Sequence, residues 1–172
     1  MSNTIDILTV VDAVSLQEAV ASGKLKKGTK TNPTSLGSYG TSDAYIYMIT
    51  ANDYVVNDQA KSELTIAANV GDTVRWMITC PGGGTGNNVI LMDWNSSSAS
   101  GIIDPISLDI DIDLYVGSAS VAPNPVEFQN YCFAGMLTKK GNVQYYITFQ
   151  LLDEHGADLG FYLWDPFINV AN

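Results

Sequence analysis

The sequence predicts an all-β fold, an antiparallel two-sheet sandwich of jelly-roll type with about nine strands and one short helix near the N-terminus. Two observations lead to this prediction. Only 15% of the 172 residues are charged, while β-branched and aromatic residues are abundant, and this composition favours strands over exposed helices. Apolar segments of strand length also recur between turn residues at regular spacing. The length fits a single domain, residues 1–172.

The expected strands and the expected helix follow from local patterns. Strand patterns cover residues 4–12, 44–50, 63–68, 73–79, 88–94, 106–115, 126–134, 143–152 and 159–164, with a last apolar segment at 167–170. The turn at residues 69–72 predicts a hairpin between the third and fourth of these strands. Ser15 and Glu18 form a capping box, which predicts about two helical turns that stop at Gly23. Residues 23–43 and 117–125 are expected to be loops.

The clearest strand pattern lies at residues 106–115, where apolar and polar residues alternate strictly. This two-residue alternation predicts a strand with one face in the core, which contains Ile110, and one face exposed to solvent. The exposed face carries Asp109, Asp111 and Asp113. Alternate residues on a strand lie nearly 7 Å apart, too far for three carboxylates to converge on one ion. We therefore interpret the three aspartates as a solvated face that discourages edge pairing, and assign no metal to them.

Composition also narrows the classes of partner. The formal charge of −10 argues against nucleic acid and against anionic membrane surfaces. No apolar run approaches the roughly 20 residues of a membrane span. The first residues show no basic segment of a classical signal peptide, so a cytoplasmic location is expected. In that compartment Cys80 and Cys132 are expected to be free, buried thiols rather than a disulfide.

No catalytic constellation is present in the sequence. His155 is the only histidine, no Gly-x-Ser-x-Gly motif occurs, and the two cysteines lack the spacing of a zinc site. The glycines at 82–84 are not followed by the Lys and Ser or Thr of a phosphate-binding loop. The sequence therefore predicts a protein that is not an enzyme.

If successive strands run antiparallel, their loops alternate between the two ends of the sandwich. One end then gathers an acidic, Asn-rich rim, a candidate site for calcium or a polyhydroxylated ligand. Its residues are Asp53, Asn57, Asp58, Asn87, Asp153, Glu154, His155 and Asp158. The other end gathers Lys24, Lys26, Lys27, Lys30, Lys139 and Lys140. Such a dipolar molecule would assemble head to tail.

The three tryptophans are expected to divide between core and surface. Trp76 and Trp164 lie within strand patterns and are expected in the core. Trp94 ends a strand beside a Ser-rich loop and is the candidate for an exposed aromatic.

Four segments carry a resemblance to a known family. They are residues 5–12 (IDILTVVD), 45–53 (YIYMITAND), 64–76 (LTIAANVGDTVRW) and 146–166 (YITFQLLDEHGADLGFYLWDP). With them the chain resembles the PixA/AidA family of bacterial inclusion body proteins over almost its full length. The resemblance implies a non-catalytic protein made in bulk, stored in cytoplasmic inclusions, controlled by quorum sensing or growth phase and linked to host association.

Two functions from different classes follow. The first is a protein that self-assembles into a homo-oligomer or lattice and is stored in bulk. The second is a lectin-like module that binds glycans through loops at one end, with calcium as the candidate cofactor. The chain has 5 methionines, which argues against a methionine store.

Overall fold

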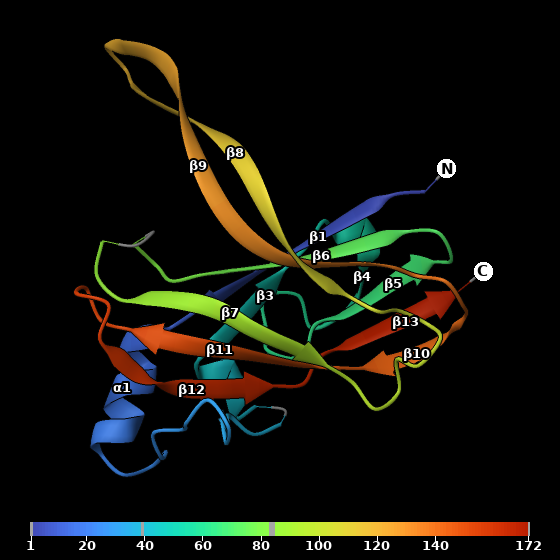
Figure 1. The fold of residues 1–172 in the computed structure, drawn as a ribbon, viewed down its shortest axis with the longest axis horizontal. Helices are drawn as coiled ribbons and strands as arrows, with labels where there is room; N and C mark the ends of the chain where they lie inside the picture. Colours follow the sequence, from blue (N-terminus) through green and yellow to red (C-terminus); the bar gives the residue numbers. More distant parts are fainter. Residues whose placement is uncertain (1, 39, 83–84, 172) are drawn as a thin grey trace.

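The computed structural model describes residues 2–38, 40–82 and 85–171. The chain is 55% strand and 9% helical, so the all-β prediction is confirmed. The arrangement differs from a simple antiparallel sandwich, because the strands form three sheets (Figure 1) and each sheet contains one parallel pairing. The described residues form thirteen strands, more than the sequence patterns predict.

The first sheet has five strands in the order β3-β1-β6-β9-β8. Their bounds are Ile46–Ile49 for β3, Thr4–Val11 for β1, Thr73–Thr79 for β6, Val121–Met136 for β9 and Ile106–Ser118 for β8. β1 and β6 run parallel, with Thr4 opposite Thr73 and Val10 opposite Thr79. Alternate residues of β1, such as Ile5 and Ile7, are fully buried. One face of this sheet therefore points to the core.

The other two sheets have four strands each. The second contains β10 (Gly141–Gln144), β13 (Phe167–Ala171), β5 (Thr65–Asn69) and β4 (Val55–Asn57), in that order. The third contains β2 (Thr34–Ser35), β12 (Asp158–Trp164), β11 (Tyr146–Leu152) and β7 (Asn88–Asn95). β12 leads into β13 through Asp165 and Pro166, so the chain passes directly from the third sheet into the second (Figure 1).

The core is rich in large aromatic side chains. Trp76, Trp164, Tyr145, Tyr162 and Phe149 are all fully buried, which confirms the prediction for the two tryptophans. Each such side chain contributes about 2–3 kcal/mol through the apolar area that it removes from water. The cysteine prediction is confirmed as well, since Cys80 and Cys132 are free and buried.

The helix begins earlier than its capping box predicts. Helix α1 spans Ala13–Ala21, and its N-cap is Asp12 rather than Ser15. The Asp12 carboxylate accepts hydrogen bonds from the Ser15 backbone N–H at 3.0 Å and from the Ser15 hydroxyl at 2.8 Å. Ser15 is therefore not the capping residue but the donor to it. The helix starts at Ala13 because the chain turns into it directly at the end of β1. Gly23 follows the helix with a φ of 76°, as its predicted stop requires.

One other prediction of local structure is wrong, and another is incomplete. The expected hairpin at the 69–72 turn does not form, because β5 pairs with β13 and β4 while β6 pairs with β1 and β9. That turn crosses between two sheets, and the buried Asp72 carboxylate holds it by accepting the Asn69 N–H at 2.9 Å. The expected loop at 23–43 contains strand β2 and the first residues of the 3-10 helix η1 (Ser42–Ala44). A second 3-10 helix, η2, spans Asn52–Tyr54.

The largest departure from the sequence prediction is a projecting two-stranded arm made by β8 and β9. β9 pairs with β6 only from Phe133 to Met136, while its pairing with β8 continues to Val121. Figure 1 shows the two strands rising away from the rest of the molecule. The expected loop at 117–125 is mostly strand, and its prolines are tolerated because β9 has an unpaired edge there.

The arm also overturns the predicted core face at residues 106–115. Ile110 and Ile112 are half-buried, while Ile106, Leu108 and Leu114 are exposed. The alternation is real, but no described layer of the chain covers the apolar side. The solvated face of Asp109, Asp111 and Asp113 is confirmed, since all three are exposed.

Candidate functional site

The predicted acidic rim is divided between two places in the fold. β3 ends with Ile49 opposite Leu8, so the chain leaves it towards the start of β1. β6 ends with Thr79 opposite Val10, so the chain leaves it beyond the end of β1. The loops after β3 and β6 therefore leave opposite ends of the first sheet, because β1 and β6 are parallel. The expectation that all the rim loops share one end is wrong.

Asp53, Asn57 and Asp58 lie on the segment that follows β3: Asp53 in η2, Asn57 at the end of β4 and Asp58 directly after it. Asp53 and Asn57 are exposed, and neither approaches the predicted partners on the other loops through the strand pairings. Asp58 forms an ion pair with Lys61, with an O–N distance of 3.2 Å. These three residues are thus separated from the rest of the predicted rim.

The other five rim residues are brought together by the third sheet. β7 and β12 flank β11, and Leu152 of β11 lies opposite both Asn88 and Asp158. The half-buried Asn87 therefore adjoins the turn that contains Asp153, Glu154, His155 and Asp158.

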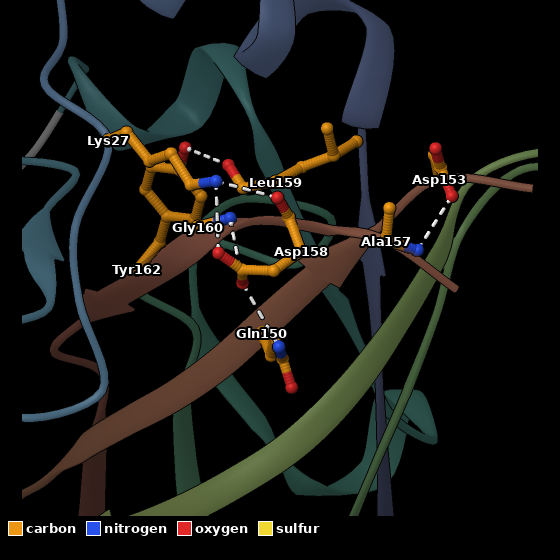
Figure 2. Close-up of polar contacts among 8 residues, drawn as sticks. All are labelled: Lys27, Gln150, Asp153, Ala157, Asp158, Leu159, Gly160 and Tyr162. Atoms are coloured by element: carbon orange, nitrogen blue, oxygen red, sulfur yellow. Dashed lines mark hydrogen bonds and ion pairs between the residues drawn. The ribbon is translucent and has the colours of Figure 1, made fainter. Parts of the chain in front are cut away.

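Within this turn, the carboxylates of Asp153 and Asp158 bind the chain itself. Figure 2 shows Asp153 and Asp158 directed at neighbouring groups. One oxygen of Asp153 accepts the backbone N–H groups of Ala157 and His155, each at 2.8 Å. These hydrogen bonds stabilise the ionised form, so they lower the pKa of Asp153 below its ordinary value. Asp153 therefore shapes the turn.

Asp158, at the start of β12, contacts both the neighbouring strand β11 and the distant loop after α1 (Figure 2). Its carboxylate accepts a hydrogen bond from the Gln150 side-chain amide at 3.0 Å and forms an ion pair with Lys27 at 3.0 Å. The hydrogen bond from Gln150, followed by that from Lys27, lowers the pKa of Asp158. Lys27 also donates to the backbone carbonyl of Asp158 at 2.6 Å. The contact ties the loop after α1 to the start of β12.

The Lys27–Asp158 pair also overturns the predicted separation of charge. Lys27 was expected at a basic end and Asp158 at an acidic end, yet the two side chains touch. The loop after α1 and the turn before β12 therefore share one end of the molecule. The predicted head-to-tail assembly required basic and acidic residues at opposite ends, so the structure does not support it.

The other two titratable side chains of the turn are exposed to solvent and contact each other. The side chains of His155 and Glu154 are 82% and 70% exposed, and they lie 3.5 Å apart. Among the described residues no three His, Cys, Asp or Glu side chains gather as a metal site requires. The same part of the chain contains no helix long and apolar enough to span a membrane. Ligand and calcium binding at the rim stay predictions.

Trp94 is half-buried rather than an exposed aromatic platform. Its ring stacks on Tyr145 with a centroid distance of 5.4 Å and an interplanar angle of 15°. The centroid of Trp76 lies 5.6 Å away. The Trp94 indole N–H is buried and has no hydrogen-bond acceptor among the described residues. Trp94 thus extends the aromatic core towards the surface.

The arm is the surface feature that sequence reasoning missed. Among the described residues, ten of the eighteen exposed large apolar side chains belong to β8 or β9. Ile112 lies opposite Phe128, and Leu114 lies opposite Val126, so these four side chains share one face. Asp111 and Asp113 lie on the other face, opposite Gln129 and Glu127. The alternating sequence signalled a two-sided strand, but it could not show that the apolar side is left uncovered.

Comparisons with known proteins agree with this fold. The family model for PixA, described as an inclusion body protein, matches residues 3–170. Curated proteins give no significant match. The chain is similar to the crystal structure of the inclusion body protein PixA from Burkholderia cenocepacia, with 19% sequence identity and a TM-score of 0.78. That match covers 99% of this chain and 97% of the other.

A much weaker likeness links the chain to the cysteine protease inhibitor EhICP2 from Entamoeba histolytica. The identity is 14% and the TM-score is 0.33, with 62% of this chain and 86% of that chain covered. A score of this size supports no inference about this chain.

Proposed function

The chain belongs to the PixA family of inclusion body proteins, and we propose that it is a non-catalytic protein that accumulates by self-association, with the β8–β9 arm as a contact surface. The observation that supports this proposal is the exposed apolar face of the arm. Leu114 and Phe128, on the two strands of that face, are 49% and 48% exposed.

Physical chemistry explains why such an arm needs a partner. An isolated two-stranded ribbon is only marginally stable in water. Exposed apolar patches on soluble proteins mark interaction surfaces. Covering a large apolar side chain contributes up to about 1.5–3 kcal/mol, and the arm offers several of them. In an inclusion body the most abundant neighbour of each chain is another copy. A second copy is therefore the partner most available to cover the arm.

Storage in cytoplasmic inclusions, with production controlled by cell density or growth phase, is part of the same proposal. Fractionation of cells that make the chain, through the growth curve, tests it. We expect the chain in dense, sedimenting particles that appear late in growth. Uniform distribution in the soluble fraction at every stage would contradict storage.

Sedimentation velocity over a concentration series tests self-association directly. We expect the wild type to shift to larger species as concentration rises, and the double variant Leu114→Asp/Phe128→Asp to remain smaller. Asp111→Asn, on the opposite face of the same strand, is the matched control and should behave as the wild type or associate more strongly. Circular dichroism checks that each variant keeps its strand content. A wild type that stays monomeric at high concentration would refute the proposed function.

Glycan binding is a second candidate, favoured by one surface of the third sheet rather than by the predicted rim. Tyr146 is exposed there, beside a hollow of about 450 Å³ that Asp93, Asn95, Thr148 and Leu163 also line. An aromatic ring beside carboxylate, amide and hydroxyl groups suits the apolar and hydroxyl faces of a sugar. A glycan array with the wild type and Tyr146→Ala tests this candidate. Binding that Tyr146→Ala leaves unchanged would exclude this surface.

A further inference from the structure

The apolar face of the arm continues into the outer face of the first sheet. Residues of β1 alternate, with Ile5, Ile7 and Thr9 buried in the core and Leu8 exposed on the other side. Strand pairing places Ile49 of β3 and Met77 of β6 beside Leu8 on this outer side. Ile49 is 42% exposed. The body of the sheet therefore presents apolar side chains away from the core.

The strand pairing shows which side of the arm is continuous with this outer side of the sheet. Arg75 of β6 lies opposite Ala134 of β9, which lies opposite Ile106 of β8. Because side chains two residues apart share a face, Leu108, Leu114 and Phe128 lie on the side of Arg75 and Leu8. One apolar surface thus runs from β3 across the sheet and along the arm; we call it the outer face.

The outer face is electrically neutral. Within the described strands of this sheet, its charged side chains are Asp6 and Arg75, which bind each other. The guanidinium donates two hydrogen bonds to the Asp6 carboxylate, at 2.6 and 2.9 Å. The remaining acidic residues of the arm, such as Asp111 and Glu127, point to the opposite side.

The outer face is also hollowed where the arm leaves the sheet. A cleft of about 610 Å³ lies there, and its walls include Leu8, Met77, Thr79, Leu114 and Phe128. Body and arm residues therefore form one concave surface rather than two separate patches.

We propose that the outer face is the interface of a two-fold symmetric dimer, in which it packs against the same face of a second copy. This inference rests on the proposed self-association and specifies its first step. Two chains of charge −10 repel each other over most of their surfaces, whereas the outer faces can meet without opposing like charges. The acidic sides of both arms would stay in solvent. Two sheets that pack face to face, about 10 Å apart, are a common arrangement in β proteins.

The charge pattern also disfavours the alternative of edge pairing between two arms. β8 is an edge strand, and an antiparallel pair of β8 strands centred on Asp111 would place Asp109 of one copy opposite Asp113 of the other. Like charges directly opposite each other destabilise a strand pair. The aspartates therefore disfavour this pairing of two β8 edges, while the apolar side of the arm remains open for association through the faces.

The available area is sufficient for a specific dimer. The 13 residues of β8 extend about 44 Å at about 3.4 Å per residue, and two strands with their side chains are about 10 Å wide. Two stacked arms alone would cover on the order of 900 Å², and the body strands add to this. Specific interfaces begin at about 1,000–1,200 Å². A two-fold contact is closed, so the dimer would be the unit from which larger assemblies are built.

Native mass spectrometry and sedimentation equilibrium test the inference without touching the arm. We expect dilute wild type to contain monomer and dimer with no trimer, and Ile49→Lys to raise the dimer dissociation constant about tenfold or more. Ile90→Lys is the matched control, because Ile90 has the same exposed fraction of 42% but lies on β7 in another sheet. It should dimerise as the wild type does.

The outcomes separate this inference from the proposed function. A wild type that is monomeric at all concentrations refutes both. A wild type that associates through a ladder of monomer, dimer and trimer refutes the closed dimer but leaves self-association standing. Equal effects of Ile49→Lys and Ile90→Lys, with both variants folded by circular dichroism, refute the outer face as the interface.

Discussion

The indole N–H of Trp76 donates a hydrogen bond of 3.0 Å to the hydroxyl oxygen of Tyr145, and both side chains are fully buried. Trp76 lies on β6 of the first sheet, whereas Tyr145 lies between β10 and β11 of the other two sheets. Burial raises the pKa of Tyr145 well above its ordinary value, so the hydroxyl stays neutral. This polar contact links the first sheet to the segment between the other two, among the large aromatic side chains of the core.

Tyr145→Phe should destabilise the fold by about 1–3 kcal/mol, because it leaves the buried indole N–H of Trp76 without an acceptor. Urea unfolding followed by tryptophan fluorescence measures the free energy of unfolding. Tyr146→Phe is the matched control, since Tyr146 is the exposed next residue on the chain. If both substitutions cost the same, the hydrogen bond does not stabilise the core.

Ile110→Asp should give a soluble, folded protein with weakened self-association. The sequence pattern alone predicts that this change abolishes folding, but the structure places Ile110 half-buried on the arm rather than in the core. The new carboxylate would therefore meet solvent in the monomer and the partner's outer face in the dimer. Gel filtration and circular dichroism of Ile110→Asp beside Asp111→Asn measure both effects. Insoluble Ile110→Asp with soluble Asp111→Asn would show that the arm packs onto the core.

The sequence could predict strands, but not their partners. Local patterns identified strands at residues 4–12 and 106–115, yet one strand is covered on its apolar side and the other is not. That difference depends on which layers face each strand, which a local pattern does not contain. The same limit applies to the 69–72 turn, whose residues suit a hairpin and equally suit a crossing between sheets.

The candidate polar site shows the limit most clearly. Local reasoning placed Lys27 and Asp158 at opposite ends because it assumed that successive strands are antiparallel. A parallel pairing of β1 with β6 breaks that alternation, and two residues 131 apart in sequence then meet. The Asp12 cap is a smaller case, since Asp12 and Ser15 are both good capping residues and the exit angle from β1 decides between them.

Asp158→Asn should lower stability at neutral pH by at most about 1 kcal/mol, because the ion pair with Lys27 is exposed and screened. The lowered pKa of Asp158 fixes the pH dependence. Its contribution is fully present above the ordinary value of 3.8 and is lost as the pH falls through the lowered folded-state pKa. Thermal melts of wild type and variant should therefore converge in acid. Glu154→Gln, in the same exposed turn, should show no such convergence.

Cys80 and Cys132 should resist thiol reagents in the folded protein. Both are buried and free, and burial raises the pKa of Cys80 to about 11, so little reactive thiolate is present near neutrality. Mass spectrometry after iodoacetamide treatment at mildly alkaline pH should find little modification until denaturant is added. Rapid modification of native protein would mean that the core around these residues opens readily.

The salt dependence of association separates an apolar interface from the charge-driven assembly that the sequence suggested. Ion pairs between exposed charges are screened over about 8 Å at physiological ionic strength, so a head-to-tail contact of opposite charges would weaken as salt rises. An interface made by the neutral outer face should respond in the opposite direction. Added sodium chloride would screen the repulsion between two chains of charge −10, and sulfate would further favour burial of apolar surface.

We therefore expect the dimer dissociation constant to stay constant or fall between about 0.05 and about 1 M sodium chloride, and to fall further in sulfate. Sedimentation equilibrium in each buffer measures it. Ile90→Lys, which changes the net charge without touching the outer face, should follow the same trend as the wild type. A dissociation constant that rises steeply with salt would show that charged surfaces hold the copies together, and the outer face would then not be the dominant contact.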